Sequence, residues 1–188
     1  MAKHQTIGAE EIRTAIQRLA EAISERHRDR KPILLLGIAN GGIELARRLH
    51  IALASLKTGL TSRAGTLDIS FHRDDIGRHP IPKEFSPTQI PDDVNGANVV
   101  IVDDVLFSGR TVKAALDELF DHGRPTKVEL AVLVDRGGRR MPLAPDYVGL
   151  DLFTPGTEKV VVTLNAENPQ RDSIRIEPAD SAAKTAAL

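Results

Sequence analysis

Apolar residues recur along this chain with two periods, one of three to four residues and one of two. The longer period predicts amphipathic helices at residues 9–28, 43–53 and 112–119. Short apolar runs between these segments predict buried strands at residues 33–38, 67–71, 99–102 and 127–135, with shorter strands near 148 and at 160–164. Because strands alternate with helices, we expect an α/β fold with a mainly parallel twisted sheet flanked by helices. Ligands of such sheets bind at the carboxyl ends of the strands.

Two segments follow neither period. Residues 73–93 contain four prolines and charges of both signs. An aperiodic stretch of about 20 residues inside a domain is usually functional or disordered, so we expect a mobile flap near the ligand edge. From Asn168 onward the chain is polar. We therefore expect one domain over residues 1–167 and a flexible polar tail over residues 168–188.

Composition limits the chemistry and the location. The 188-residue chain has no cysteine, which excludes disulfides and thiolate metal sites. Its six histidines form no pair at metal-ligand spacing, so we expect no metal site in the apoprotein. The sequence has neither a long apolar run nor a secretory start, so we expect a cytoplasmic protein without membrane contact. A net charge of −1 gives no general attraction to nucleic acid.

The most informative segment covers residues 99–111. Four apolar residues predict a strand, Asp103 and Asp104 follow it, and a Ser-Gly-Arg-Thr turn leads into the next helix. Backbone N–H groups at a helix start have no intrahelical partner and attract phosphate. Gly109 allows close approach of the backbone, and Ser108 adds a hydroxyl donor. The two carboxylates precede this turn by about the length of one sugar, so they can accept hydrogen bonds from ribose hydroxyls while the turn binds the phosphate. The segment is therefore suited to binding a sugar phosphate.

Each part of this segment also has a simpler explanation. Ser108 or Gly109 can merely cap a helix, and paired aspartates after a strand are common in loops. Both parts together, at this spacing, are far more specific. The segment resembles the phosphoribosyl pyrophosphate signature of the type I phosphoribosyltransferases.

Other blocks resemble the PyrR family, which comprises bifunctional pyrimidine operon regulators and uracil phosphoribosyltransferases. These blocks are residues 65–75, 123–125, 130–137 and 145–149. The resemblance implies a Rossmann-like type I phosphoribosyltransferase fold and conversion of uracil and phosphoribosyl pyrophosphate (PRPP) to UMP and pyrophosphate. It also implies magnesium bound with PRPP, and a homodimer or larger homo-oligomer.

The resemblance further implies roles for individual residues. Asp103 and Asp104 orient the ribose and, together with Arg73, are the expected catalytic residues. The expected substrate-binding residues are Asn40, Gly41, Gly42, Asp103, Asp104, Val105, Leu106, Phe107, Ser108, Gly109, Arg110, Thr111, Asp135 and Arg136.

The other loops that contain expected site residues can also be explained by a purely structural role. Gly41 and Gly42 can merely permit a turn, and Arg73 can belong to a solvated charged turn. Asp135 and Arg136 can form an ordinary surface turn. The family often has Thr-Arg-Gly where this chain has Asn-Gly-Gly, so a cation that would neutralise pyrophosphate is absent from this loop.

Two alternatives for the function stay open. The first is a UMP-dependent RNA-binding attenuator with weak or no catalysis. RNA-binding relatives present a basic first helix, but Gln17 and Glu21 occupy that helix here. Such relatives also present basic residues after the strand at 127–135. The cations that remain in these two regions are Arg18 and Arg26 on the helix, and Arg139 and Arg140 after the strand. Because phosphate contacts dominate RNA affinity, we favour an enzyme or nucleotide sensor. The second alternative is a purine phosphoribosyltransferase, since base choice depends on a few pocket contacts.

Overall fold

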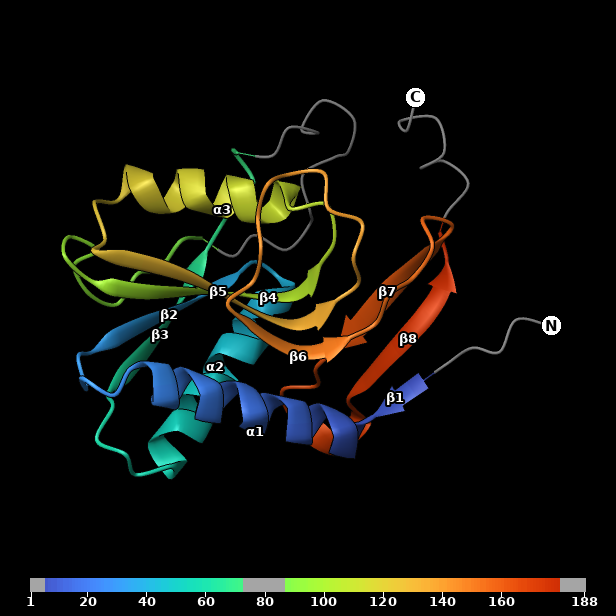
Figure 1. The fold of residues 1–188 in the computed structure, drawn as a ribbon, viewed down its shortest axis with the longest axis horizontal. Helices are drawn as coiled ribbons and strands as arrows, with labels where there is room; N and C mark the ends of the chain where they lie inside the picture. Colours follow the sequence, from blue (N-terminus) through green and yellow to red (C-terminus); the bar gives the residue numbers. More distant parts are fainter. Residues whose placement is uncertain (1–5, 73–86, 180–188) are drawn as a thin grey trace.

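A five-stranded parallel sheet forms the centre of the computed structural model, which describes residues 6–72 and 87–179 (Figure 1). The strand order is β3-β2-β4-β5-β6, and every neighbouring pair is parallel. The strands are β2 (Ile33–Ile38), β3 (Ser62–Leu67), β4 (Asn98–Leu106), β5 (Lys127–Asp135) and β6 (Tyr147–Asp151). The expected α/β fold with a mainly parallel sheet is therefore confirmed.

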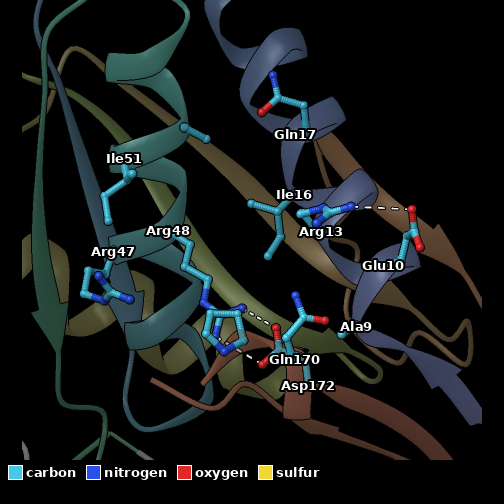
Figure 2. A pocket seen from close by; sticks show the side chains of 12 residues that line it. Ala9, Glu10, Arg13, Ile16, Gln17, Arg47, Arg48, Ile51, Gln170 and Asp172 are labelled. Carbon is cyan, nitrogen blue, oxygen red and sulfur yellow. Dashed lines mark hydrogen bonds and ion pairs between the residues drawn. The ribbon is translucent and has the colours of Figure 1, made fainter. Parts of the chain in front are cut away.

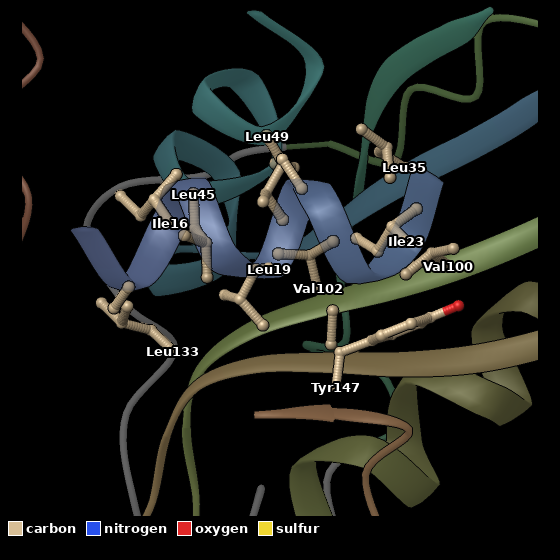
Figure 3. Close-up of a cluster of buried hydrophobic side chains, with 14 of the residues drawn as sticks. Ile16, Leu19, Ile23, Leu35, Leu45, Leu49, Val100, Val102, Leu133 and Tyr147 are labelled. Carbon is tan, nitrogen blue, oxygen red and sulfur yellow. The ribbon is translucent and has the colours of Figure 1, made fainter. Parts of the chain in front are cut away.

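Different helices cover the two faces of this sheet. Helices α1 (Ala9–Arg26) and α2 (Gly41–Ser55) pack on one face, and α3 (Arg110–Asp121) packs on the other (Figure 1). Successive side chains of a strand point to opposite faces, so Leu35 contributes to the α1–α2 side and Leu36 to the α3 side. Figure 3 shows the core on the α1–α2 side, in which side chains from both helices meet those of β2, β4, β5 and β6. Burying one such leucine or isoleucine stabilises the fold by about 1.5–3 kcal/mol.

A second, smaller sheet stands beside the first. Its antiparallel strands are β1 (Thr6–Gly8), β8 (Ser173–Pro178) and β7 (Glu158–Thr163), in that spatial order. A short 3₁₀ helix, η1 (Pro169–Arg171), precedes β8. The prediction of a flexible tail from residue 168 is therefore wrong as far as residue 179, and residues 180–188 lie outside the described part.

Buried contacts explain why residues 168–179 are held in place. The Asp172 carboxylate accepts hydrogen bonds from the Arg48 guanidinium of α2 (Figure 2). It also accepts the Asn165 backbone N–H at 2.8 Å. Ile174 of β8 is only 1% exposed. A buried ion pair and a buried apolar side chain thus fix a segment whose sequence is otherwise polar.

The strand predicted over residues 67–71 is wrong in position. The structure places β3 at Ser62–Leu67, and the chain turns immediately after it. The cause is Asp68, whose Oδ1 accepts hydrogen bonds from the Ser70 N–H at 2.9 Å and from the Ser70 hydroxyl at 2.5 Å. An aspartate that accepts from a backbone N–H two residues later forms a turn and prevents strand pairing.

A buried carboxylate near the amino end of β5 collects several donors. Glu129 is 3% exposed and accepts from Arg26 at 2.9 Å, His27 at 2.6 Å, Lys127 at 2.7 Å and the Tyr147 hydroxyl at 3.2 Å. Burial alone would raise the pKa of Glu129, but bonds to Lys127 and His27 lower it below its ordinary value. This cluster connects the end of α1 to the sheet.

Candidate active site

The carboxyl ends of β2, β4 and β5 meet at one edge of the large sheet. Gly37 of β2 lies opposite Val102 of β4, and Leu106 of β4 lies opposite Asp135 of β5. The last residues of these three strands, the loops that follow them and the starts of α2 and α3 contain all the expected site residues within the described ranges. Arg73 lies outside the described residues, as do residues 73–86 of the expected flap.

The aspartate pair lies inside the last part of β4, because this strand continues to Leu106 rather than ending at Val102. Asp103 is 5% exposed, and its Oδ1 accepts the Asp104 N–H at 3.1 Å. Burial raises the pKa of Asp103 well above its ordinary value, and repulsion from Asp104 raises it further. Burial also raises the pKa of Asp104.

No arginine, lysine or histidine of the described ranges forms an ion pair with either carboxylate. Strongly perturbed acidic groups at a sheet edge, without a charge partner of their own, are candidates for binding a ligand. Such carboxylates accept hydrogen bonds from hydroxyl groups and coordinate cations.

The glycine loop after β2 packs directly against this acidic pair. A Cβ atom on Gly41 would overlap the Asp104 carboxylate, and one on Gly42 would overlap the Val102 carbonyl oxygen. These glycines are therefore required for α2 to start close to β4, and they do more than permit a turn. Asn40 is the N-cap residue of α2, where no side-chain cap is formed.

The turn after β4 leads into the first turn of α3. Gly109 occupies the N-cap position with φ +90°, a conformation that glycine adopts without strain. A Cβ here would also lie 3.0 Å from the Met141 side chain. The first N–H groups of a helix have no intrahelical acceptor; Gly109 has no side chain to cap α3, and the Ser108 Oγ accepts the Arg110 N–H at 3.4 Å. Together with the Ser108 hydroxyl, this arrangement suits a phosphate group.

The comparisons with known proteins agree with this geometry. Residues 8–163 match the model of the phosphoribosyl transferase domain family. A protein of Chloroflexus aurantiacus named "Bifunctional protein PyrR" is 45% identical over 161 residues, which are 85% of this chain and 87% of the relative. The protein of the same name from Streptomyces coelicolor is 48% identical over 165 residues, 87% of this chain and 84% of the relative. This chain belongs to the PyrR family of phosphoribosyl transferases.

Solved structures support the PyrR fold. The hypoxanthine phosphoribosyltransferase of Trypanosoma cruzi in complex with IMP has a TM-score of 0.69 at 23% identity, covering 99% of this chain and 96% of that one. An asparagine mutant of an invariant aspartic acid in such an enzyme has a TM-score of 0.70 at 23% identity, covering 99% and 98%. At this identity the likeness establishes the type I phosphoribosyltransferase fold.

Arg136 of this PyrR chain has its guanidinium bonded within the protein. It donates to the carbonyl oxygens of Pro155 at 3.3 Å and Glu158 at 2.6 Å, and it lies 4.1 Å from the centre of the Phe107 ring. Burial lowers the pKa of Arg136. Asp135 likewise has internal partners, because it accepts the Gly137 N–H at 2.8 Å and pairs with Arg139. Both residues therefore shape the loop after β5.

The contacts of Arg139 were not foreseen from the sequence, where this residue counted only as a surface cation. Its side chain is 22% exposed and bonds to the turn after β4. No periodic pattern marks such a residue, because it connects two loops that meet only in the folded chain. Neighbouring glycines and the adjacent Asp135 are the weak signals that the sequence offers.

A separate hollow of about 310 Å³ lies between α1, α2 and η1 (Figure 2). Its walls include Ile16 and Ile51, and Arg13 and Arg47 stand at its sides. None of the expected site residues lines this hollow. Within the described ranges, no helix is both long and apolar enough to cross a membrane.

Proposed function

We propose that this PyrR protein joins uracil to PRPP and releases UMP and pyrophosphate. The observation that carries the proposal is the direct packing of Gly41 against the Asp104 carboxylate and of Gly42 against Val102, beside the buried Asp103, with the phosphate-type turn following on the same strand. In the proposed reaction the glycine loop would bind pyrophosphate, the aspartates the ribose and the turn the 5′-phosphate, which is the order in which PRPP carries these groups. Relatives at 45% and 48% identity that are named PyrR support the choice of uracil.

The reaction needs positioning and electrostatics more than covalent catalysis. The bond from C1′ to the pyrophosphate oxygen breaks with its electron pair on pyrophosphate. A bond from uracil N1 to C1′ forms, and the N1 proton is lost to solvent. Positive charge develops at C1′ in between, and Asp103 and Asp104 would stabilise it while accepting the ribose hydroxyls. The turn at residues 108–111 would hold the 5′-phosphate through its N–H groups.

Magnesium fits this set of residues as an ion that arrives with the substrate. Among the described residues, no group of three or more histidine, cysteine, aspartate or glutamate side chains could hold a metal by itself. Magnesium in such sites is held by one or two carboxylates together with substrate oxygens, and Asp103 and Asp104 can supply those carboxylates. When bound, it would neutralise charge on pyrophosphate, which the Asn40–Gly42 loop cannot do with a cationic side chain.

Radiolabelled uracil, hypoxanthine and orotate, each tested separately with PRPP and magnesium, examine this proposal. We expect UMP from uracil and no product above background from the other two bases. The variant Asp103→Asn with Asp104→Asn should give no UMP, and replacing the exposed Asp151 by asparagine should leave the rate unchanged. Turnover of hypoxanthine alone would favour the purine alternative, and no turnover of any base would contradict the enzyme.

The attenuator alternative predicts RNA binding, and the contacts of the two cations that remain on α1 speak against it. Arg18 donates to the Gly149 carbonyl at 3.2 Å, and Arg26 pairs with Glu129. Gln17 donates to Glu21 at 3.0 Å on the face where relatives present cations. We therefore predict weak or no binding of pyrimidine-operon leader RNA at about 0.15 M salt with UMP present, measured by filter retention. Tight, sequence-dependent retention would overturn this prediction.

A further inference from the structure

The guanidinium of Arg139 connects the loop after β5 to the turn after β4. Its Nη1 donates to the carbonyl oxygens of Leu106 at 3.4 Å, Phe107 at 3.0 Å and Gly137 at 3.4 Å. Its Nη2 donates to the Asp135 carboxylate. A planar fork of donors suits several fixed acceptors at once, and a lysine ammonium does not reproduce that geometry. One side chain therefore holds two loops in a defined relation.

Backbone hydrogen bonds from the same segment extend this connection. The Ser108 carbonyl oxygen accepts the N–H groups of Arg140 at 2.9 Å and Met141 at 3.0 Å. The Leu106 carbonyl oxygen also accepts the Arg136 N–H at 3.1 Å. The carbonyl groups of residues 106, 107 and 108 consequently all point toward residues 136–141.

Peptide geometry converts these carbonyl contacts into a direction for the N–H groups. In a planar trans peptide, the carbonyl of one residue and the N–H of the next point in opposite directions. The N–H groups of Phe107, Ser108 and Gly109 therefore face away from residues 136–141. Consecutive amide donors aimed to one side form a concave anion site, which the start of α3 extends.

We propose that Arg139 is a positioning residue for the 5′-phosphate turn. It acts through the carbonyl oxygens of Leu106 and Phe107, which it holds so that the following N–H groups face the phosphate. Its ion pair with Asp135 links the turn to the loop after β5, so the two loops are placed together. This inference rests on the proposed function, since it requires that the turn binds the phosphate of PRPP and UMP.

Two ligands that each contain part of PRPP test the proposal. Ribose 5-phosphate contains the 5′-phosphate, and magnesium pyrophosphate contains only the leaving group. Isothermal calorimetry would measure both on the wild type, Arg139→Gln, Arg139→Lys and the neighbouring control Arg140→Gln. The Arg140 side chain is exposed, and only its backbone N–H contacts the turn, so this control should bind both ligands as the wild type does.

We expect Arg139→Gln to bind ribose 5-phosphate about tenfold more weakly and pyrophosphate within twofold of the wild type. In turnover assays this variant should raise KM for PRPP more than it lowers kcat. Arg139→Lys keeps the charge toward Asp135 but cannot bond both carbonyl oxygens. Its melting temperature should therefore be higher than that of Arg139→Gln, while its affinity for ribose 5-phosphate should stay as low.

Wild-type affinity for ribose 5-phosphate in Arg139→Gln or Arg139→Lys would overturn the positioning role. An equal loss of both ligands would overturn it too, because a general structural role predicts that result. A wild type that binds ribose 5-phosphate but forms no UMP would contradict the proposed reaction and leave the positioning role standing. A wild type that binds neither ligand would overturn both.

Discussion

Replacing Asp103 with asparagine should weaken ligand binding and stabilise the fold at the same time. The side chain is 5% exposed, and no described cation pairs with it. Asparagine has the same shape and keeps an oxygen that can accept the Asp104 N–H, which is now 3.1 Å from Oδ1. The substitution therefore removes a buried charge without creating a cavity or losing this hydrogen bond.

The magnitude follows from the geometry of adjacent strand residues. Neighbouring Cα atoms are about 3.8 Å apart and their side chains diverge, so the two carboxylate charges of Asp103 and Asp104 lie about 6 Å apart. At an effective dielectric constant of about 20, their repulsion is about 3 kcal/mol when both are ionised. Partial protonation and the cost of burying an amide reduce the gain to about 1–2 kcal/mol. For a chain of this size, that raises Tm by about 3–6 °C.

The raised pKa of Asp103 determines how the stability difference between Asp103→Asn and the wild type should change with pH. Burial raises the pKa of Asp103 in the folded state, so the folded protein binds more protons than the unfolded chain between the two pKa values. Wild-type stability is therefore complete below the unfolded pKa and falls as pH rises through the folded pKa. The advantage of Asp103→Asn should be present at about pH 7.5 and should shrink toward pH 4, near the unfolded aspartate pKa of about 3.9.

Thermal unfolding at a series of pH values, with UMP calorimetry alongside, tests this reasoning. Asp151 carries an exposed carboxylate, and Asp151→Asn should change neither Tm nor UMP affinity. Asp103→Asn combined with Asp104→Asn should lose most UMP binding while remaining folded. A Tm at or below the wild-type value at neutral pH, or a gap that does not change with pH, would refute the electrostatic argument. Unchanged UMP affinity in the folded double variant would refute the ribose assignment.

Two further substitutions should each destabilise the fold. Gly42→Ala should lower the free energy of unfolding by about 2–3 kcal/mol in chemical denaturation, because its Cβ would overlap the Val102 carbonyl oxygen. The control Gly156→Ala, whose Cβ would have no atom within 4 Å, should change this free energy by less than about 0.5 kcal/mol. Glu129→Gln should cost about 1–3 kcal/mol at neutral pH, since it removes the anion to which the buried His27 and Tyr147 and the partly exposed Arg26 and Lys127 donate. Because the pKa of Glu129 is lowered, this loss should shrink as pH falls through that pKa, and a constant loss down to acid pH would contradict the account.

The sequence predicted the large sheet well because each of its central strands is buried on both faces. The prediction for residues 127–135 matches β5 at both ends, since apolar side chains mark that strand along most of its length. The same rule failed for β3, an edge strand whose residues 62–66 are only partly buried or exposed and whose sequence is correspondingly polar. Apolar alternation at residues 67–71 instead reflects buried side chains on a turn that Asp68 closes.

The small sheet and the loop contacts could not be predicted by the same means. Strand β1 pairs with β8, so Ile7 lies opposite Ile174, and no local pattern encodes a pairing over that separation. Glycine motifs indicated the loops after β2 and β4, but their mutual contact depends on the parallel register of the two strands. Family likeness predicts that Arg136 lies near the ligand, and this stays a prediction; what the sequence did not indicate is that its guanidinium donates to carbonyl groups before and within β7.

Carboxylates near the two ends of the large sheet differ in their charged partners and in the direction of their pKa shifts, and this difference separates stability from function in this fold. Near the amino end of β5, Glu129 receives donors from three basic side chains and a tyrosine, and the net effect lowers its pKa. Near the carboxyl end of β4, the buried Asp103 and the partly buried Asp104 are neighbours that form no ion pair with a described cation, and their pKa values rise. Removing the first carboxylate should therefore destabilise the protein, and removing the second should stabilise it. A substrate that brings its own cation and hydroxyl groups would give the second pair partners that no side chain of the described ranges provides, so ligand binding should raise Tm through the aspartates and leave the contribution of Glu129 unchanged.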